Sequence, residues 1–259
     1  MDTGVWRLTE LVEEFTHRVL DPAFPCMFAA RPVLEDTLLF GLAETGTARE
    51  AADLLAEAAG VISKEPEQIV VIFADLPAIG SLVAEREFSA EVLRSLRRLD
   101  RHDWPEATPL DPEDPRWVFW FEGVDFFFNF STPGHRARRS RSLGPAWTAV
   151  VQSRSSFDTF AGVDHRARVR IRARLAEYDA VPPHTALGSY GDPSNREAHQ
   201  YFLGDGVGPG QPLVDVEDLR PAERDAQPGR PAGNSTHDVA PAVSTPAPVE
   251  REGGSDARD

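Results

Sequence analysis

Apolar side chains recur at helical spacing in three stretches of the N-terminal half of the chain. The first stretch ends at Asp21-Pro22, and its apolar residues stand three or four positions apart: Leu8, Leu11, Val12, Phe15 and Val19. The second is rich in Ala and Leu, begins at Thr47, which has the capping-box spacing to Glu50, and stops at Gly60. The third has its apolar stripe at Val92, Leu96 and Leu99. Because residues three or four apart share one helix face, the pattern predicts three amphipathic helices.

Continuous apolar runs and aromatic clusters, bounded by turn residues, predict the strands. The predicted strands are Thr37–Ala43, Gln68–Ala74, Ala146–Gln152 and two aromatic strands within Arg116–Phe130 that turn at Glu122-Gly123. Ala23–Pro32, between the first helix and the first strand, is expected to be irregular or briefly extended. Ser131–Arg141 is expected to be a loop, with the start of a helix as an open alternative at its end.

The segment His165–Asp179 fits two kinds of secondary structure. Its arginines alternate with other residues, which is the period of a strand, whereas Ile171, Leu175 and Tyr178 have helical spacing. We favour a helix, because arginine is a good helix former. The predicted order is then α-β-α-β-α-β-β-β-α, which indicates a single α+β domain with a largely antiparallel sheet flanked by helices.

The last part of the chain differs in composition from the rest. From Glu217 to Asp259 large aliphatic and aromatic residues are almost absent, and Pro, Gly, Ala, Ser and charged residues replace them. Such a segment buries too little apolar surface to offset its ordering entropy. The sequence therefore predicts a folded domain over residues 1–216 and a disordered tail over 217–259 that is dispensable for folding.

Charge and cysteine content narrow the class of protein. The formal net charge of −15 argues against nucleic acid or an anionic membrane as the main partner. The apolar runs are too short to cross a bilayer, and no secretory leader pattern opens the chain. Cys26 is the single cysteine, which excludes an intrachain disulfide and fits a reducing compartment. We therefore expect a cytoplasmic protein.

The basic residues are concentrated in one region. Ten arginines lie between Arg136 and Arg174, against only Asp158 and Asp164 as acidic residues. Such a cluster favours a nearby anion, because the arginine fork matches a carboxylate with two hydrogen bonds. The region is either a solvated face that pairs with the acidic surplus of the protein or a clamp for the carboxylate of a ligand.

Two residues outside the arginines carry candidate chemistry. Cys26, in FPCMF, is either a small buried hydrophobe, a nucleophile or a metal ligand. His135, in STPGH, is either a structural residue or a functional one. No HExxH, CxxC, CxxCH, Walker A, GxGxxG or GxSxG pattern is present. Gly204–Gly210 is rich in glycine, but no strand-turn-helix surrounds it, and we interpret it as a loop.

Seven phrases in series resemble the YqcI/YcgG family of bacterial proteins. In order along the chain they are FPCMFA, LRRLDRHDWPEA, PRWVFWFEGVDFFFN, STPGHRARRSR, SRSSFD, RVRIRARLAEYD and LGSYGDPSNREAHQYFL. Characterised members of that family are haem-dependent enzymes of natural-product pathways, and they include N-hydroxylases of arginine and of guanidine-bearing arginine derivatives, as in the guanitoxin and D-cycloserine routes. The resemblance therefore implies a haem-dependent monooxygenase of natural-product biosynthesis that hydroxylates a nitrogen of a small guanidine or amine.

The resemblance also implies roles for the candidate residues. Haem b would be held non-covalently, because CxxCH is absent. Cys26 is expected to be the iron ligand through its thiolate, with His135 as the alternative ligand or as a catalytic proton donor. Three arginines are expected to bind carboxylates of the haem or of the substrate: Arg139, Arg141 and Arg154. The aromatic residues of Trp117–Phe128 either wall the porphyrin or form a strand core.

The expected reaction needs two further partners. O2 supplies the oxygen atom, and a separate reductase supplies two electrons, because the sequence contains no flavin or nicotinamide motif. Two alternatives stay open at this point. One is a peroxide-driven haem oxidant of small amines, and the other is a non-catalytic haem-binding or haem-sensing protein.

Overall fold

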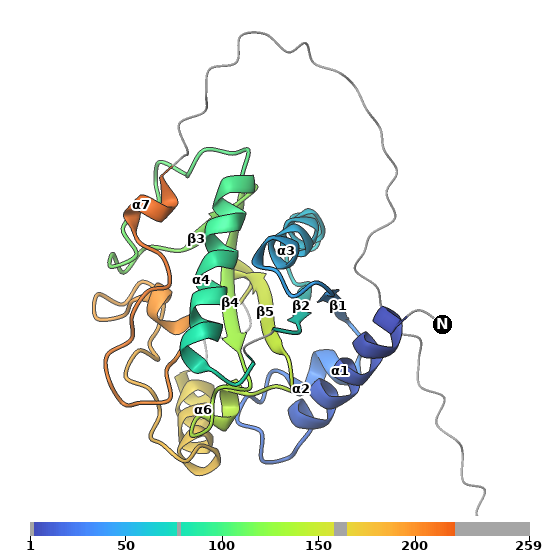
Figure 1. The fold of residues 1–259 in the computed structure, drawn as a ribbon. Helices are drawn as coiled ribbons and strands as arrows, with labels where there is room; N and C mark the ends of the chain where they lie inside the picture. Colours follow the sequence, from blue (N-terminus) through green and yellow to red (C-terminus); the bar gives the residue numbers. More distant parts are fainter. Residues whose placement is uncertain (1–2, 77–78, 158–164, 221–259) are drawn as a thin grey trace, which may run out of the picture.

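A five-stranded sheet lies at the centre of the parts of the chain that the computed structural model describes, residues 3–76, 79–157 and 165–220 (Figure 1). The strands are β1 (Leu38–Ala43), β2 (Ile69–Ala74), β3 (Phe119–Phe121), β4 (Val124–Ser131) and β5 (Trp147–Ser153). Their spatial order is β1-β2-β5-β4-β3. The β1–β2 pair is parallel and the other pairs are antiparallel. The predicted α+β class with a largely antiparallel sheet is confirmed.

Helices cover both faces of this sheet (Figure 1). α3 (Ala48–Ile62) and α4 (Leu82–Leu99) pack on one face, and α1 (Thr3–Val19) with the short α2 (Ala30–Leu34) packs on the other. The remaining helical segments are η1 (Arg139–Arg141), α5 (Arg154–Phe157), α6 (His165–Tyr178), η3 (Glu197–Gln200) and α7 (Val216–Leu219). Among the described residues, no helix combines the length and the apolar character that a membrane span requires.

Strand β2 is buried on both faces, which explains its continuous apolar sequence. Val70 and Ile72 belong to the core beneath α3 and α4, whereas Val71 and Phe73 belong to the core around α1. Successive side chains of a strand point to opposite faces, so one run of apolar residues serves two layers. The two cores therefore meet at this strand.

The clustered aromatic residues lie inside the larger core. Five of them are buried there: Trp117, Phe119, Phe121, Phe126 and Phe128. Tyr201 packs against this group, with its ring centroid 5.7 Å from that of Trp117. Its hydroxyl donates a hydrogen bond to the Phe126 carbonyl oxygen at 2.7 Å. These contacts support the interpretation of the aromatic residues as a strand core.

The N-terminus of α3 shows half of the predicted capping box. Thr47 Oγ1 accepts a hydrogen bond from Glu50 N at 3.3 Å. The Glu50 carboxylate accepts from the backbone N–H groups of Glu44 and Thr45 instead of from Thr47. Glu50 therefore fixes the turn that leads into the helix.

The predicted end of α3 is wrong, because the helix continues through Gly60 to Ile62. Ile62 is buried. Burying such a side chain stabilises by about 1.5–3 kcal/mol, more than the roughly 1 kcal/mol that a helical glycine costs. Packing of the last turn therefore outweighs the local signal to stop.

Two other segments can be compared with the structure predicted for them. The helix favoured for His165–Asp179 is confirmed as α6. Ala23–Pro32, expected to be irregular or extended, consists of turns that enter α2 at Ala30. Val33 of α2 packs on the core around α1, which gives this short helix an apolar contact.

Helix α7 extends the folded domain beyond the predicted boundary at residue 217. Leu219 is fully buried, and its carbonyl oxygen accepts a hydrogen bond from Arg97 Nε at 2.8 Å. Asp218 forms an ion pair with Arg94 of α4 at 3.1 Å. Residues 217–220 therefore belong to the domain, and their deletion would remove a buried leucine. Residues 221–259 of the predicted tail lie outside the described residues.

Candidate functional site

The loop between β4 and β5 carries several of the candidate residues, and a buried carboxylate of α4 fixes its first turn. Glu85 is fully buried. It accepts hydrogen bonds from Gly134 N at 2.9 Å, from Thr132 Oγ1 at 2.7 Å and from Gly80 N at 2.6 Å. These bonds hold the turn that precedes His135.

Two further carboxylates hold the middle of the same loop. Asp205 accepts hydrogen bonds from the backbone N–H groups of Arg136, Ala137 and Arg138 at 2.7–2.9 Å. Burial acts to raise the pKa of Asp205, but these donors outweigh burial and the pKa lies below its usual value. Asp179 accepts from both N and Oγ of Ser140 at 2.8 Å. Three carboxylates from three separate segments thus define the loop.

Gly134→Ala is expected to lower the free energy of unfolding by about 3 kcal/mol, because it overpacks this turn and breaks a buried hydrogen bond. A Cβ at Gly134 would lie 2.1 Å from Glu85 Oε2 and 2.8 Å from Leu82 N. Urea denaturation measures the effect. The control is Gly60→Ala, where a Cβ meets nothing within 4 Å. It is expected to stabilise α3 by roughly 0.5–1 kcal/mol. Wild-type stability of Gly134→Ala would contradict the description of this turn.

His135 is buried in the loop, and both of its ring nitrogens contact other protein atoms. Nε2 donates to the Leu203 carbonyl oxygen at 2.6 Å, and Nδ1 lies 3.1 Å from Thr132 Oγ1. The ring packs against Phe202 with centroids 5.2 Å apart. Burial lowers the pKa of His135, so the ring is neutral near pH 7. The imidazole therefore ties the loop to the Leu203 segment, with a protein partner at each nitrogen.

Arg138 is a buried cation with many partners. Its guanidinium donates to the carbonyl oxygens of Gly204 at 2.9 Å, Pro182 at 3.2 Å and Gly206 at 3.1 Å. The Asp179 carboxylate lies 3.7 Å from Nη1. The Arg138 side chain therefore joins the loop to the segments around residues 182 and 205.

Arg141 is also buried, but its partners carry no charge. It donates to Asn129 Oδ1 and to the Gln200 carbonyl oxygen, the latter at 3.3 Å. Within the part of the chain that the structure describes, it forms no ion pair with a carboxylate. Burial lowers the pKa of Arg141 to about 10, and the charge of Arg138 acts in the same direction. The charge of Asp179 acts in the opposite direction, although Asp179 does not form an ion pair with Arg141. A buried guanidinium without a directly paired carboxylate favours an anion beside it.

Cys26 lies within electrostatic reach of Arg141 and is half-buried. Burial raises the pKa of the Cys26 thiol. Hydrogen bonds from the backbone N–H groups of Phe28 and Ala29, and the charge of Arg141, act against this rise. The thiol is therefore protonated near pH 7, in surroundings that already contain donors and a positive charge for a thiolate.

Helix α6 fixes the loop on which Cys26 lies. Arg174 Nη2 donates to the carbonyl oxygens of Pro22 and Phe24 at 2.5 and 2.6 Å. The Phe24 ring packs edge-to-face on Tyr178 with centroids 6.0 Å apart. Part of the predicted arginine cluster thus holds the cysteine loop through backbone carbonyls.

The other two predicted arginines, Arg139 and Arg154, do not lie in the group formed by Cys26, His135 and Arg141. Arg139 is exposed, and its guanidinium lies over the Tyr178 ring at 4.5 Å. Arg154 forms a buried ion pair with Glu197 at 2.9 Å. Arg154 directly follows Ser153, the last residue of β5, which pairs with Phe126 near the start of β4. The β4–β5 loop begins at the other end of β4. The structure therefore brings Cys26 and His135 near Arg141, and separates Arg154 from them.

The sequence profile of the YqcI/YcgG family matches residues 15–212, about three quarters of the chain and the whole of the group around Arg141. The chain belongs to this family. "Uncharacterized protein YcgG" of Bacillus subtilis (strain 168) is 40% identical over 195 residues, which cover 70% of this chain and 76% of the relative. "Uncharacterized protein YqcI" of the same organism is 34% identical over 196 residues, with coverage of 70% and 76%.

A third YqcI/YcgG relative has a name that states an activity. "Putative N(omega)-hydroxy-L-arginine synthase DcsA" of Streptomyces lavendulae is 32% identical over 204 residues, which cover 73% of this chain and 76% of the relative. No solved structure matches the chain.

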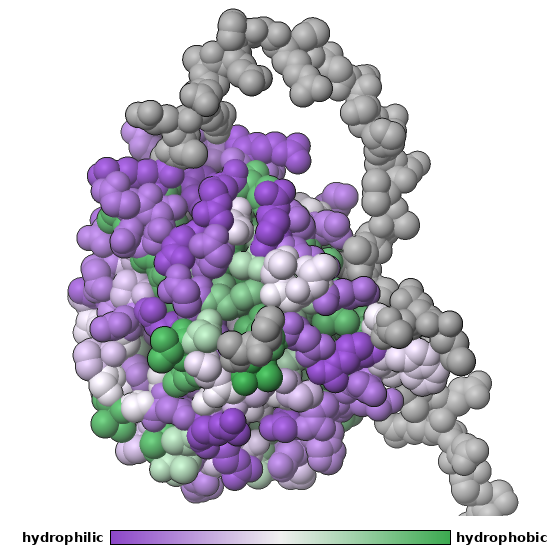
Figure 2. All heavy atoms as spheres, in the orientation of Figure 1, coloured by the Kyte–Doolittle hydropathy of each residue, from purple (hydrophilic) through white to green (hydrophobic). Residues whose placement is uncertain are grey.

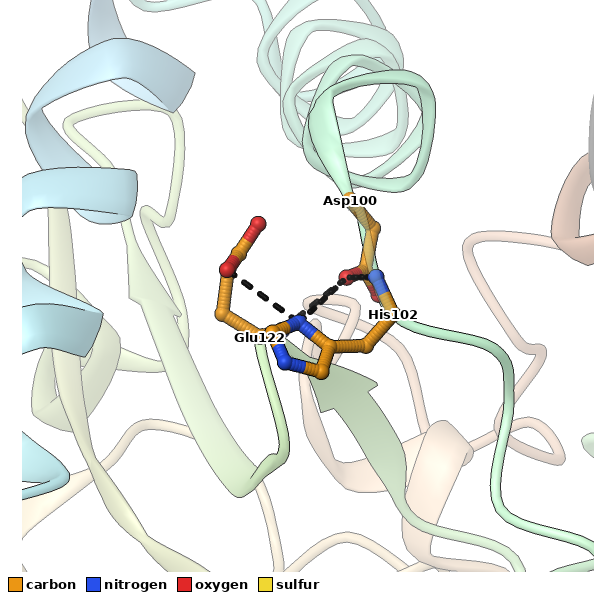
Figure 3. A group of neighbouring side chains, drawn as sticks. All are labelled: Asp100, His102 and Glu122. Carbon is orange, nitrogen blue, oxygen red and sulfur yellow. Dashed lines mark hydrogen bonds and ion pairs between the residues drawn. The ribbon is translucent and has the colours of Figure 1, made fainter. Parts of the chain in front are cut away.

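This YqcI/YcgG chain also carries a group of metal-ligating side chains in the matched phrase LRRLDRHDWPEA and the adjacent hairpin. Figure 3 shows Asp100, His102 and Glu122, whose ligand atoms lie within 4.8 Å of one another. Asp100 already accepts hydrogen bonds from Arg97 Nη1 and from the backbone N–H groups of His102 and Glu122. The group therefore fastens the end of α4 to the turn between β3 and β4.

Sequence reasoning missed the three carboxylates that define the loop, although one of them had a signal. Glu85 shares a face of α4 with Ser89 and Val92, so an acidic residue stands on the buried stripe of an amphipathic helix. No such signal marks Asp205, because its partners are backbone N–H groups 67 to 69 positions away.

Proposed function

We propose that this YqcI/YcgG protein is a haem-dependent monooxygenase that hydroxylates a nitrogen atom of a small, arginine-like guanidine or amine in natural-product biosynthesis. The observation that carries the proposal is the similarity to DcsA, whose name is "Putative N(omega)-hydroxy-L-arginine synthase", over 73% of this chain. In the reaction an N–H bond becomes N–OH. One atom of O2 enters the substrate and the other leaves as water, with two protons from solvent and two electrons from a separate reductase.

Two features of the group formed by Cys26, His135 and Arg141 support haem b as the cofactor. The Arg141 guanidinium is buried without a carboxylate partner among the described residues, which suits a haem propionate. The half-buried Cys26 thiol beside it suits the iron, because a coordinating thiol loses its proton. When bound, haem supplies oxygen activation, which a thiolate ligand promotes by donating electron density to iron.

His135 fits the role of iron ligand less well than Cys26. Its Nε2 donates to the Leu203 carbonyl oxygen and its Nδ1 contacts Thr132. Ligation or proton donation would require breaking one of these buried contacts, which costs about 1–3 kcal/mol. These contacts favour Cys26 as the ligand and give His135 the role of positioning the loop.

The test is turnover by the full-length protein loaded with haemin. We expect a Soret band on titration with haemin and, with L-arginine or agmatine, O2 and a reductase, a product heavier by one oxygen atom in mass spectrometry. Omitting the reductant is the control. Turnover with peroxide but not with O2 and reductant would contradict the monooxygenase, and haem binding without any turnover would indicate a binding protein. Absence of both a Soret band and a product would overturn the proposal.

A further inference from the structure

A pocket of about 260 Å³ lies between the start of α4 and the glycine-rich segment Gly204–Gly210. Leu82, Val83 and Phe202 supply its apolar lining. Figure 2 shows hydrophobic surface on the face of the molecule where α4 begins, and Val83 is 82% exposed there. The two basic side chains that line the pocket are Arg86 and His184. Neither was singled out from the sequence.

His184 offers a hydrogen-bond donor to this pocket. The residue is 5% exposed, and its Nδ1 accepts a hydrogen bond from Ala186 N at 3.1 Å. A neutral imidazole whose Nδ1 is an acceptor carries its proton on Nε2. Nε2 has no hydrogen-bond partner among the described residues. Burial, together with the charges of Arg138 and Arg141, lowers the pKa of His184, so the ring is neutral near pH 7.

Arg86 brings a positive charge to the same pocket. Its Nη2 donates to the Pro212 carbonyl oxygen at 2.7 Å, and it forms no ion pair within the described parts of the chain. The carboxylates of Glu85 and Asp205 each accept three hydrogen bonds from the β4–β5 loop or the turn at Gly80, and neither forms an ion pair with Arg86. The Arg86 charge is therefore available to a ligand.

The glycine-rich segment Gly204–Gly210, predicted to be a loop, forms the opposite wall of the pocket. A Cβ built on Gly204 or Gly206 would meet no atom closer than 3.9 Å, and one on Gly208 would meet none within 4 Å. Larger residues at these positions would extend into open space. Glycine thus lets the backbone line the pocket without filling it.

We propose that this pocket binds a small carboxylate with a short apolar chain. Arg86 and the Nε2–H of His184 receive the carboxylate, and the chain contacts Leu82 and Phe202. The inference stands on these side chains and not on the proposed N-hydroxylation. The carboxylate is either that of an amino-acid substrate or that of a separate small acid, and competition distinguishes the two.

The probes are butyrate and butyramide, which share a chain and differ in charge. Ligand-observed NMR on the full-length protein is expected to give at least about 10-fold tighter binding of butyrate, the difference typical of a charge-assisted hydrogen bond. Arg86→Gln and His184→Gln are each expected to weaken butyrate binding by about 5-fold or more. Arg98→Gln, the same change on an exposed part of α4, is expected to leave binding unaltered.

Because a buried histidine variant can fail to fold, the imidazole resonances of His184 in the wild-type protein provide a second readout, and they should move when butyrate is added. Equal affinity for butyrate and butyramide, no binding of butyrate, or unchanged binding by Arg86→Gln would overturn the proposal. Displacement of butyrate by L-arginine would identify the substrate as the source of the carboxylate, and absence of displacement would identify a separate acid.

Discussion

Cys26→Ala is expected to remove the strongly red-shifted Soret band of the ferrous-CO form and to reduce N-hydroxylation to background. The thiol is the only one in the chain, and Arg141 and two backbone N–H groups already favour a negative charge on it. Removing the proposed ligand should cost more activity than the roughly 10–100-fold that replacing a supporting residue around a metal costs. The measurements are absorption spectra of reduced, CO-treated protein and the rate of product formation.

His135→Ala is the matched comparison, since His135 is the alternative ligand. We expect it to keep the red-shifted band and to lower the free energy of unfolding, because its ring joins the loop to Leu203. A globin-like band that survives Cys26→Ala and disappears in His135→Ala would transfer the role of ligand to His135. Such a result would also require His135 to release the Leu203 carbonyl oxygen.

Arg138→Met is expected to affect mainly stability and Arg141→Met mainly haem binding, although the two arginines are buried three positions apart. Arg138 joins three carbonyl oxygens and lies near Asp179, so its loss leaves buried acceptors and a carboxylate without their cation. Removing one partner of such a pair costs about 3–5 kcal/mol. Arg141 has no carboxylate partner among the described residues and donates only to the neutral acceptors Asn129 Oδ1 and Gln200 O, so its removal should cost about 1–2 kcal/mol, less than the removal of Arg138.

Arg141→Met should instead weaken haem binding by about 10–100-fold, the loss expected for one charge-assisted hydrogen bond to a propionate. Urea denaturation gives the stability of both variants, and titration with haemin gives the affinity. If Arg141→Met were as unstable as Arg138→Met and bound haemin normally, Arg141 would be a structural residue. The clamp interpretation would then be wrong.

The layers of the fold could be predicted because local pattern and tertiary packing agree there. The continuous apolar run of β2 and the alternation of β4 both follow from the faces they bury. Prediction failed where tertiary contacts override a local signal, as at Gly60 in α3 and at Leu219 beyond the predicted boundary. Neither burial is visible in the sequence around the residue.

The site was only partly predictable for a related reason. Residue type and the phrases that resemble the family identified Cys26, His135 and Arg141. They did not indicate which arginine would be buried without an ion-pair partner. Arg139 and Arg141 stand two positions apart in the same phrase, yet one lies exposed over Tyr178 and the other is buried near Cys26. That difference depends on long-range contacts, which sequence spacing does not report.

The three carboxylates that define the β4–β5 loop have a consequence for how the protein is made. Glu85 precedes its partners in the loop by 47 to 49 residues. Asp179 follows its partner Ser140 by 39 residues, and Asp205 follows its partners by 67 to 69 residues. During synthesis, the loop cannot reach its final conformation until residue 205 has left the ribosome, by which time all five strands, the last of which ends at Ser153, are already outside. Contacts of such sequence separation form slowly. Nascent chains arrested before residue 205 should therefore contain the sheet but be unable to retain haem.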